Sequence, residues 1–272
     1  MPHRHKELES PRKRIDEIDE EILDLLAERA KTVQDVIRAK VENKLPVFVP
    51  ERETEKSERY KAMAQKKGID PVWAEDFLRM IMSSSRDSQS QEKFPIATEE
   101  PKNILYIGGD GGMGKLYKRI TKQTGHQTYS IDKSNWHELE GLSDKLDLVI
   151  ITVPINVTEH VIERLKGRLK KETILADFTS NKSVPMKAML DNHDGPVLGL
   201  HPMHGPDVEN LSKQLMVVCP ARDAEKANWF IKQCELWGMR IVHAEPEKHD
   251  HVMHLVQGLR HFVALLHGSF MI

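Results

Sequence analysis

The chain has 272 residues, which is enough for two domains and a sizeable core. Its 40 Lys and Arg residues nearly balance its 42 Asp and Glu residues, so a surface that binds nucleic acid or an anionic membrane over the whole protein is not expected. With two cysteines, no transmembrane-length apolar run and no apolar segment behind the charged N-terminus, we expect a soluble cytoplasmic protein with no disulfide scaffold and no membrane partner.

Residues 1–92 are predicted to form a helical domain, since Gly68 is the only glycine between residues 11 and 91. Two cations, Arg29 and Lys40, lie on the apolar stripe of the first long helix, three turns apart. Because an unpaired buried charge is costly, we expect a small dianion between them, across ~16 Å of helix. The alternative is that both cations reach water or pair with glutamates of a helical bundle. The stripe has apolar residues three and four apart, at Ile15, Ile18, Ile22, Leu25, Val33 and Val36.

Arg12 lies at the edge of the same stripe, 28 residues before Lys40. That separation is ~42 Å along one straight helix, so the two side chains cannot reach one ligand. If Arg12 contacts a ligand, it therefore serves the site of a partner chain. We expect a homodimer with shared sites, since so long a helix also needs a partner to bury its stripe.

Two shorter helices are predicted to follow. The segment from Pro46 to Pro50 ends the first helix, and Pro50 suits the first turn of the second, which carries Arg52 and Glu53. The third helix covers residues 71–91, where Ser85 and Gln89 are four apart and share a face.

Residues 93–102 contain two prolines and mixed charge, as is typical of a linker. Residues 103–245 then alternate short apolar runs with helical segments, which predicts a doubly wound, mostly parallel sheet with helices on both faces. Residues 246–272 are predicted to be helical to about Phe270. The predicted strands are Asn103–Gly108, Gln127–Ile131, Leu146–Val153, Thr173–Phe178, Val197–Leu200, Leu215–Cys219 and Arg240–Ala244.

The first of these strands leads into a G-x-G-x-x-G motif with Gly109, Gly111 and Gly114, and Met113 lies within it. A strand before, a helix after and Asp132 at the end of the next strand complete the context of a Rossmann-type dinucleotide site. Gly109 is expected to allow the tight turn, Gly111 the approach of a pyrophosphate, and Gly114 close helix packing. Asp132 would accept hydrogen bonds from the ribose and repel a 2′-phosphate, so NAD is the expected cofactor.

Several stretches resemble known families. The sequence P-R-K-R-I-D from Pro11, with Lys40 and P-V-F-V-P-E-R-E from Pro46, resembles the all-helical chorismate mutase family. V-P-I-N-V-T-E from Val153 and H-D-G-P-V-L-G-L-H-P-M from His193 resemble prephenate dehydrogenase. In this order they are similar to the bifunctional chorismate mutase/prephenate dehydrogenase family of tyrosine biosynthesis, for which tyrosine is a candidate feedback inhibitor.

The mutase resemblance implies that chorismate is rearranged to prephenate without covalent catalysis. It implies that Arg29 and the Arg12 of a partner chain hold the two carboxylates of the substrate, and that Lys40 and Gln89 donate to the ether oxygen. Arg52, Glu53 and Ser85 would orient the substrate, with Glu53 at its hydroxyl. Val49 stands where related mutases carry an Asp contact.

The dehydrogenase resemblance implies that prephenate is oxidised with NAD and decarboxylated to 4-hydroxyphenylpyruvate. His201 would be the catalytic histidine, and Ser180 would orient His201 or the substrate hydroxyl. His204 replaces a usual Phe, and Asp110 brings a negative charge near the expected pyrophosphate. Further matching positions with undefined roles are Lys182, His193, His249 and His261.

Family members continue for about a hundred residues into a helical dimerisation domain, a usual domain size, and residues 246–272 would be its incomplete start. We therefore expect a shortened chain in which mutase activity is the safer expectation. The alternatives are a mutase whose second domain only binds a regulatory ligand such as tyrosine, and an inactive scaffold. His249, His251 and His254 are spread over more than one helix face, so no metal site is expected.

Overall fold

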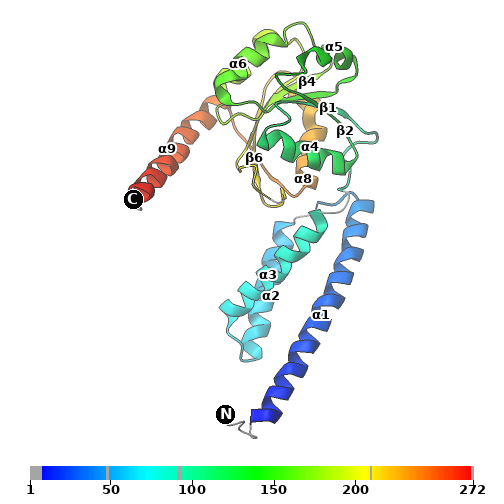
Figure 1. Ribbon diagram of the computed structural model, residues 1–272, viewed down its shortest axis with the longest axis vertical. Coiled ribbons are helices and arrows are strands. Elements are labelled where there is room, and N and C mark those ends of the chain that lie inside the picture. The colour runs from blue at the N-terminus through cyan, green and yellow to red at the C-terminus, as the bar shows by residue number, and fades with distance from the viewer. Residues whose placement is uncertain (1–7, 47–48, 91–93, 209, 271–272) are drawn as a thin grey trace.

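The computed structural model describes residues 8–46, 49–90, 94–208 and 210–270, and it shows a helical domain joined to an α/β domain (Figure 1). The predicted fold class is confirmed. In the helical domain, α2 and α3 pack side by side, and the longer α1 runs beside them (Figure 1). The bounds are α1 Glu9–Glu42, α2 Pro50–Lys66 and α3 Pro71–Ser90.

Local sequence signals explain where these helices begin and end. Asn43 closes α1, because its side-chain amide donates to the Ala39 carbonyl oxygen at 2.7 Å. Pro50 begins α2, as predicted, at a position where its missing N–H costs nothing. Gly68, with a φ of 71°, follows α2 in the left-handed conformation that glycine adopts without strain. Asp70 precedes α3 and accepts the Val72 N–H at 2.8 Å.

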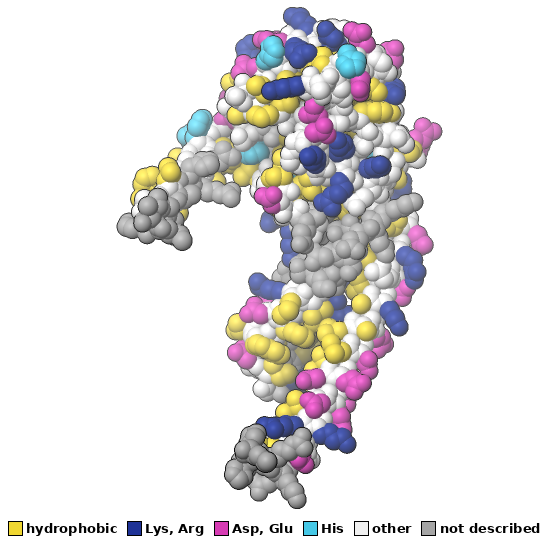
Figure 2. Space-filling model, viewed as in Figure 1, with side chains coloured by type: hydrophobic (Ala, Val, Ile, Leu, Met, Phe, Trp, Pro, Cys, Tyr) yellow, Lys and Arg dark blue, Asp and Glu magenta, His cyan; other side chains and the backbone are white. Residues whose placement is uncertain are grey.

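The apolar stripe of α1 is largely exposed within the single chain. Ile15 and Leu25 are 55% and 65% exposed, whereas Ile37 is buried. Figure 2 shows hydrophobic side chains gathered on one face of the helical domain. A helix of 34 residues therefore presents a long apolar surface that its own chain does not cover.

The α/β domain is built on a seven-stranded sheet in the order β2-β1-β3-β4-β5-β6-β7. Strands β1 to β5 are parallel, β6 is antiparallel to β5, and β7 is parallel to β6. The strand order reverses at β1, so the crevice beyond the carboxyl ends of β1 and β3 is the expected ligand position for this topology. The bounds are β1 Asn103–Ile107, β2 Gln127–Ile131, β3 Leu148–Ile151, β4 Ile174–Asp177, β5 Val197–Pro202, β6 Leu215–Pro220 and β7 Arg240–His243.

Helices cover both faces of this sheet, so its central strands are buried on both sides. Alternate residues of β1 divide between two cores: Tyr106 packs with α4 and α8, and Leu105 packs with α5, α6 and α7. The bounds are α4 Gly112–Thr124, α5 Leu139–Leu142, α6 Ile155–Arg164, α7 Ser183–Asn192, α8 Asn228–Leu236 and α9 Pro246–Phe270, with 3₁₀ turns η2 Trp136–Glu138, η3 Ser143–Lys145 and η4 Ala224–Ala227.

Residues 94–102, part of the segment predicted to be a linker, are held against the α/β domain. The fully buried Gln233 of α8 accepts the Ala97 N–H at 2.9 Å and donates to the Pro95 carbonyl oxygen at 3.0 Å. Phe94 belongs to the core beneath α4 and α8. Residues 94–97 are therefore fixed to the α/β domain by specific contacts.

Helix α9 leaves the α/β domain at Pro246 and projects away from it (Figure 1). Beyond Met253 its apolar side chains are exposed, among them Leu255, Leu259 and Phe262. Within the described parts of the chain, no helix is long and apolar enough to cross a membrane.

Candidate active sites

Helices α1 and α2 bring four of the predicted mutase residues together. The pKa of Lys40 is lowered by burial and then by the nearby Arg52, and Glu53 opposes this shift. The pKa of Lys56 is also lowered, first by burial and then by Arg29 and Arg52. These mutual effects group four cations and one carboxylate, here called the cation cluster. The cation cluster consists of Arg29, Lys40, Arg52, Lys56 and Glu53.

Lys56 is the member that sequence reasoning missed. It lies four residues after Arg52 and three after Glu53, so the three share a face of α2. That spacing was the available signal. The cluster is rich in positive charge in a partly desolvated place, which is the arrangement that binds a dianionic ligand.

The other three predicted mutase residues are Arg12, Ser85 and Gln89. Arg12 is exposed on the first turns of α1. Along a straight helix it lies ~42 Å from Lys40, so this chain does not bring the two together. Ser85 and Gln89 belong to α3, but their side chains lie outside the described residues. Val49, in extended conformation, precedes α2 at the position of the missing Asp contact.

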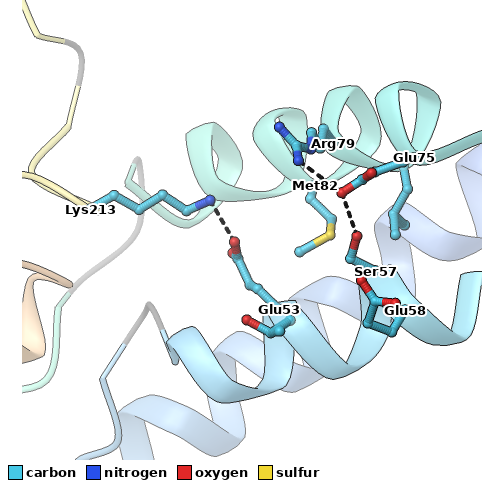
Figure 3. Close-up of a pocket in the computed structure, with 9 residues that line it drawn as sticks. Glu53, Ser57, Glu58, Glu75, Arg79, Met82 and Lys213 are labelled. Carbon is cyan, nitrogen blue, oxygen red and sulfur yellow. Dashed lines mark hydrogen bonds and ion pairs between the residues drawn. The ribbon is translucent and has the colours of Figure 1, made fainter. Parts of the chain in front are cut away.

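Glu53 also faces a cavity of about 410 Å³ between α2 and α3. There it meets Lys213 of the α/β domain, whose Nζ lies 2.5 Å from Oε2 of Glu53 (Figure 3). Across the cavity, Glu75 accepts hydrogen bonds from Ser57 and Arg79 at 2.7 and 2.8 Å (Figure 3). Ser57, then Arg79, then Lys61 lower the pKa of Glu75 to about 2. This carboxylate is therefore charged and held in place.

The glycine turn connects β1 to α4. The left-handed conformation, with a φ of 84°, falls at Gly108, and a Cβ on Gly109 would lie 2.3 Å from the Ser130 hydroxyl oxygen. A Cβ on Gly114 would lie 2.5 Å from the Gly108 carbonyl oxygen and 2.6 Å from the Gly109 Cα. Only glycine permits this close approach of helix and strand. Gly111 precedes α4 and is exposed.

Asp132 follows β2 and faces the same turn. Its Oδ2 accepts the Asp110 N–H at 3.3 Å and the Ser130 hydroxyl at 3.2 Å. The carboxylate of Asp110 pairs instead with Lys118 of α4 at 3.1 Å, which lowers the pKa of Asp110. The negative charge of Asp110, which the sequence places near the expected pyrophosphate, is thus paired with Lys118.

These residues fit a dinucleotide. The N-terminus of α4 begins at Gly112, at the point where the strand order reverses, and its first N–H groups, including that of Met113, have no acceptor within the helix. Gly111 places no side chain before them, and Asp132 lies beside the turn as a ribose acceptor. The arrangement supplies a phosphate site and a hydroxyl acceptor side by side.

A chain of hydrogen bonds ends at the predicted catalytic histidine. His201, at the carboxyl end of the parallel part of the sheet, bonds through Nδ1 to Nε2 of His249 at 2.9 Å. Nδ1 of His249 bonds to Oδ1 of Asp250 at 2.8 Å. Asp250 also accepts the N–H groups of Lys182 and Ser183 at 2.7 and 2.8 Å, so α7 fixes its carboxylate. Asp250 was not predicted from the sequence.

This chain, here called the His201–His249–Asp250 relay, determines which nitrogen holds the proton. An ionised carboxylate only accepts, so His249 donates from Nδ1 to Asp250. A neutral His249 then accepts at Nε2, and His201 must donate from Nδ1. Nε2 of a neutral His201 is therefore left with its lone pair, as a proton acceptor requires.

Lys182 lies beside the relay and is fully buried. Its Nζ is 2.5 Å from Oδ2 of Asp177 and donates to the Leu200 carbonyl oxygen at 2.8 Å. Burial lowers the pKa of Lys182, and the Asp177 carboxylate opposes that shift. Burial first, and then the Lys182 charge, lower the pKa of His201 to about 3, so His201 is neutral at physiological pH.

The remaining predicted positions divide between the site and the scaffold. Ser180 lines a cavity of about 270 Å³ with Asp250, yet the bond that orients His201 comes from His249. His193 bonds to the Thr173 carbonyl oxygen at 2.7 Å, at the amino end of the sheet and away from the site. His204 stacks on Tyr117 with ring centroids 5.9 Å apart, so it fills the place of an aromatic residue.

The C-terminal histidines do not gather around a common point. His251 and His254 are exposed on α9, while His249 is buried against His201, and the side chain of His261 lies outside the described residues. Among the residues that the structure describes, no group of three or more His, Cys, Asp or Glu could hold a metal ion.

Comparison with known proteins places each half of the chain. Residues 11–90 match the family described as chorismate mutase type II, and residues 119–243 match the nucleotide-binding domain of prephenate dehydrogenase. The chain is 39% identical to the T-protein of Enterobacter agglomerans over 96% of its own length and 70% of that protein. It is 37% identical to the T-protein of Haemophilus influenzae over 96% of this chain and 69% of that one.

A solved structure agrees with the α/β fold. Prephenate dehydrogenase from Aquifex aeolicus, in complex with hydroxyphenyl propionate and NAD⁺, superposes with a TM-score of 0.55 at 19% identity. The match covers 64% of this chain and 70% of that chain. At this identity the likeness concerns the fold alone.

Proposed function

Because this chain belongs to the bifunctional chorismate mutase/prephenate dehydrogenase family, we propose that its two halves catalyse consecutive reactions at the sites described above. The helical domain rearranges chorismate to prephenate. The α/β domain, with NAD, oxidises and decarboxylates prephenate to 4-hydroxyphenylpyruvate in tyrosine biosynthesis. The observation that carries the assignment is that one chain holds both the cation cluster and the His201–His249–Asp250 relay.

In the mutase site, the protein holds the substrate in the folded conformer that reacts. Arg29 binds one carboxylate of chorismate, and Lys40 donates a hydrogen bond to the ether oxygen, where negative charge develops as the bond breaks. Arg52 and Glu53 orient the substrate, with Glu53 at its hydroxyl, and Ser85 and Gln89 complete the site from α3. No proton transfer or covalent intermediate is needed, so fixed positive charge is the main requirement.

We infer that the mutase site is completed by a second copy of the chain. Two observations support this proposal: Arg12 lies far along α1 from Lys40, and the α1 stripe is exposed in the single chain. A homodimer would cover the stripe and bring Arg12 of one protomer to the cation cluster of the other. A long helix whose apolar stripe is exposed in the single chain also needs such a partner for its stability.

In the dehydrogenase site, His201 accepts the proton of the C4 hydroxyl of prephenate at Nε2, since its Nδ1 is bound to His249. Asp250 holds His249, and through it the ring of His201, in the required tautomer. Gly111, Met113, Gly114 and Asp132 hold the cofactor. When bound, NAD supplies the hydride acceptor, and loss of the ring carboxylate as carbon dioxide completes the aromatic ring.

The same family assignment leads us to propose how this protein is regulated and where it is located. We infer feedback inhibition by tyrosine, the product of the pathway, which an assay of both activities with added tyrosine would reveal. A cytoplasmic location is supported by the two cysteines, Cys219 and Cys234, which are buried and unpaired as in a reducing compartment.

Mixing two inactive variants tests the mutase proposal. Lys40→Ala should abolish chorismate turnover, because it removes the donor to the ether oxygen, and Arg12→Ala should do so by removing a carboxylate ligand. Co-refolded or co-expressed, the two should recover roughly a quarter of wild-type activity, since half of the dimers are mixed and each contains one intact site. NAD-dependent oxidation of prephenate serves as the control for folding. An unchanged rate in Lys40→Ala would refute the mutase site, and full loss in the mixture would refute shared sites.

A further inference from the structure

Lys213 lies in the turn before β6, in the α/β domain, and its backbone is fixed. Its N–H donates to the Gly238 carbonyl oxygen at 2.8 Å, and the next residue, Gln214, accepts the Arg240 N–H at 2.8 Å. Its φ is 68°, in the left-handed region that few non-glycine residues adopt. The turn therefore holds Lys213 in one conformation that points its side chain out of the domain.

The ammonium group of Lys213 crosses to the helical domain. It lies 2.5 Å from Oε2 of Glu53, and the two side chains are 43% and 23% exposed (Figure 3). Glu53 is also a member of the cation cluster, where its charge opposes the lowering of the pKa values of Lys40 and Lys56. One carboxylate is thus shared between the mutase site and a cation of the other domain.

We propose that Lys213 is a positioning residue for the mutase reaction: it holds Glu53 at the edge of the cation cluster and offsets its negative charge. The inference rests on the proposed role of Glu53 in the mutase site. Without Lys213, the carboxylate would be drawn more strongly toward Lys40 and Lys56, the two cluster cations whose pKa its charge already affects. It would then compete with the carboxylates of chorismate for the same charges.

The consequence concerns binding more than the chemical step. Lys213→Met should raise KM for chorismate about two- to fivefold and leave kcat within about twofold, the range for a partly exposed ion pair. Lys213→Arg keeps the charge and should restore a KM near the wild-type value. Lys213→Glu places a like charge opposite Glu53 and should raise KM further than Lys213→Met.

A matched control is Lys232→Met on α8. Lys232 forms an exposed pair with Glu235 at 3.0 Å within its own helix, so its loss removes one charge from the same domain without touching Glu53. This variant should leave both mutase constants unchanged. Oxidation of prephenate by the Lys213 variants should also be unchanged, since Lys213 belongs to neither the glycine turn nor the relay.

The decisive experiment is a double-mutant cycle with Glu53→Gln, measured as chorismate turnover. In the Glu53→Gln background the carboxylate is absent, so adding Lys213→Met should produce no further rise in KM. If Glu53→Gln slows the reaction but Lys213→Met leaves KM unchanged, the positioning role is refuted. If the two effects on KM simply multiply, Lys213 acts independently of Glu53 and the proposal is also refuted. If Glu53→Gln itself has no effect, the assignment of Glu53 to the mutase site fails first.

Discussion

Asp250→Asn tests the His201–His249–Asp250 relay, because it changes one atom and reverses the hydrogen-bond pattern. Oδ1 of Asp250 accepts from Lys182 and His249, and Oδ2 accepts from Ser183. An amide nitrogen in either place must face an N–H group. If it donates to Nδ1 of His249, that ring takes the opposite tautomer and donates to His201 from Nε2. His201 then carries its own proton on Nε2 and cannot accept one from the substrate.

The size of the effect follows from these contacts. Loss of a correctly placed proton acceptor costs about 10²- to 10⁴-fold in rate, so kcat for prephenate oxidation should fall by at least about a hundredfold. One backbone N–H at the start of α7 also loses its acceptor, which should lower the free energy of unfolding by about 1–3 kcal/mol. The Asp250 charge raises the pKa of His201, so the variant should also lower that pKa further.

The assay compares both activities of the same chain. Formation of reduced cofactor from prephenate reports the relay, and chorismate turnover reports whether the protein is folded, since the cation cluster lies in the other domain. NMR of the imidazole nitrogens gives the tautomer of His201 without any turnover. A dehydrogenase rate within about threefold of wild type, with the tautomer changed, would refute the role given to Nε2. An equal fall in both activities would show a general loss of folding.

Three further predictions concern the cofactor site and stability. Asp132→Ala should weaken NAD binding by about tenfold, because it removes the acceptor of the ribose hydroxyls. It should also narrow the preference for NAD over NADP, because the charge that repels a 2′-phosphate is lost. Calorimetric titration with both cofactors measures the two affinities. Gly114→Ala places a Cβ 2.5 Å from the Gly108 carbonyl oxygen. It should therefore lower the free energy of unfolding by about 1–3 kcal/mol and abolish NAD binding. The control Gly141→Ala, with open space around its Cβ, should change neither. Burial lowers the pKa of His201 from 6.5 to about 3, and the unfolded chain therefore binds the extra proton as pH falls below 6.5. As the pH falls below 6.5, the free energy of unfolding should therefore decrease by up to about 1.4 kcal/mol per pH unit for this group. In His201→Asn, the free energy of unfolding from denaturation curves should depend less on pH.

Much of the fold follows from the sequence because its signals are local. The break at Pro50 and the glycine turn depend on residues within a few positions, and each lies where periodicity and turn chemistry indicated. The left-handed residue, Gly108, was not singled out from the sequence, since a run of glycines permits the turn at more than one position. The packing of Gln233 on residues 94–102 could not be predicted, because it joins segments more than 130 positions apart.

The same distinction holds for the sites. Arg29 and Lys40 were predicted because helical spacing places them on one stripe, and Asp132 because it ends a strand. Lys213 and Asp250 were missed. Each contacts a partner far along the chain, Glu53 for Lys213 and the amino end of α7 for Asp250. The sequence pattern around either residue is that of an ordinary exposed charge.

The buried Lys182 helps to keep His201 neutral before a substrate binds. Burial and the Lys182 charge lower the pKa of His201 when no substrate is bound, while Asp177 pairs with Lys182 at 2.5 Å. Prephenate brings two carboxylates into a site where the relay already ends in a carboxylate, and each added negative charge favours the protonated form of His201. The histidine is thus kept neutral, with Nε2 open, before binding, and becomes a stronger base once the dianion is present. The Lys182 charge keeps His201 neutral before binding, and the anionic substrate raises the pKa of His201 once it is bound. His201 is therefore most basic when the substrate is in place.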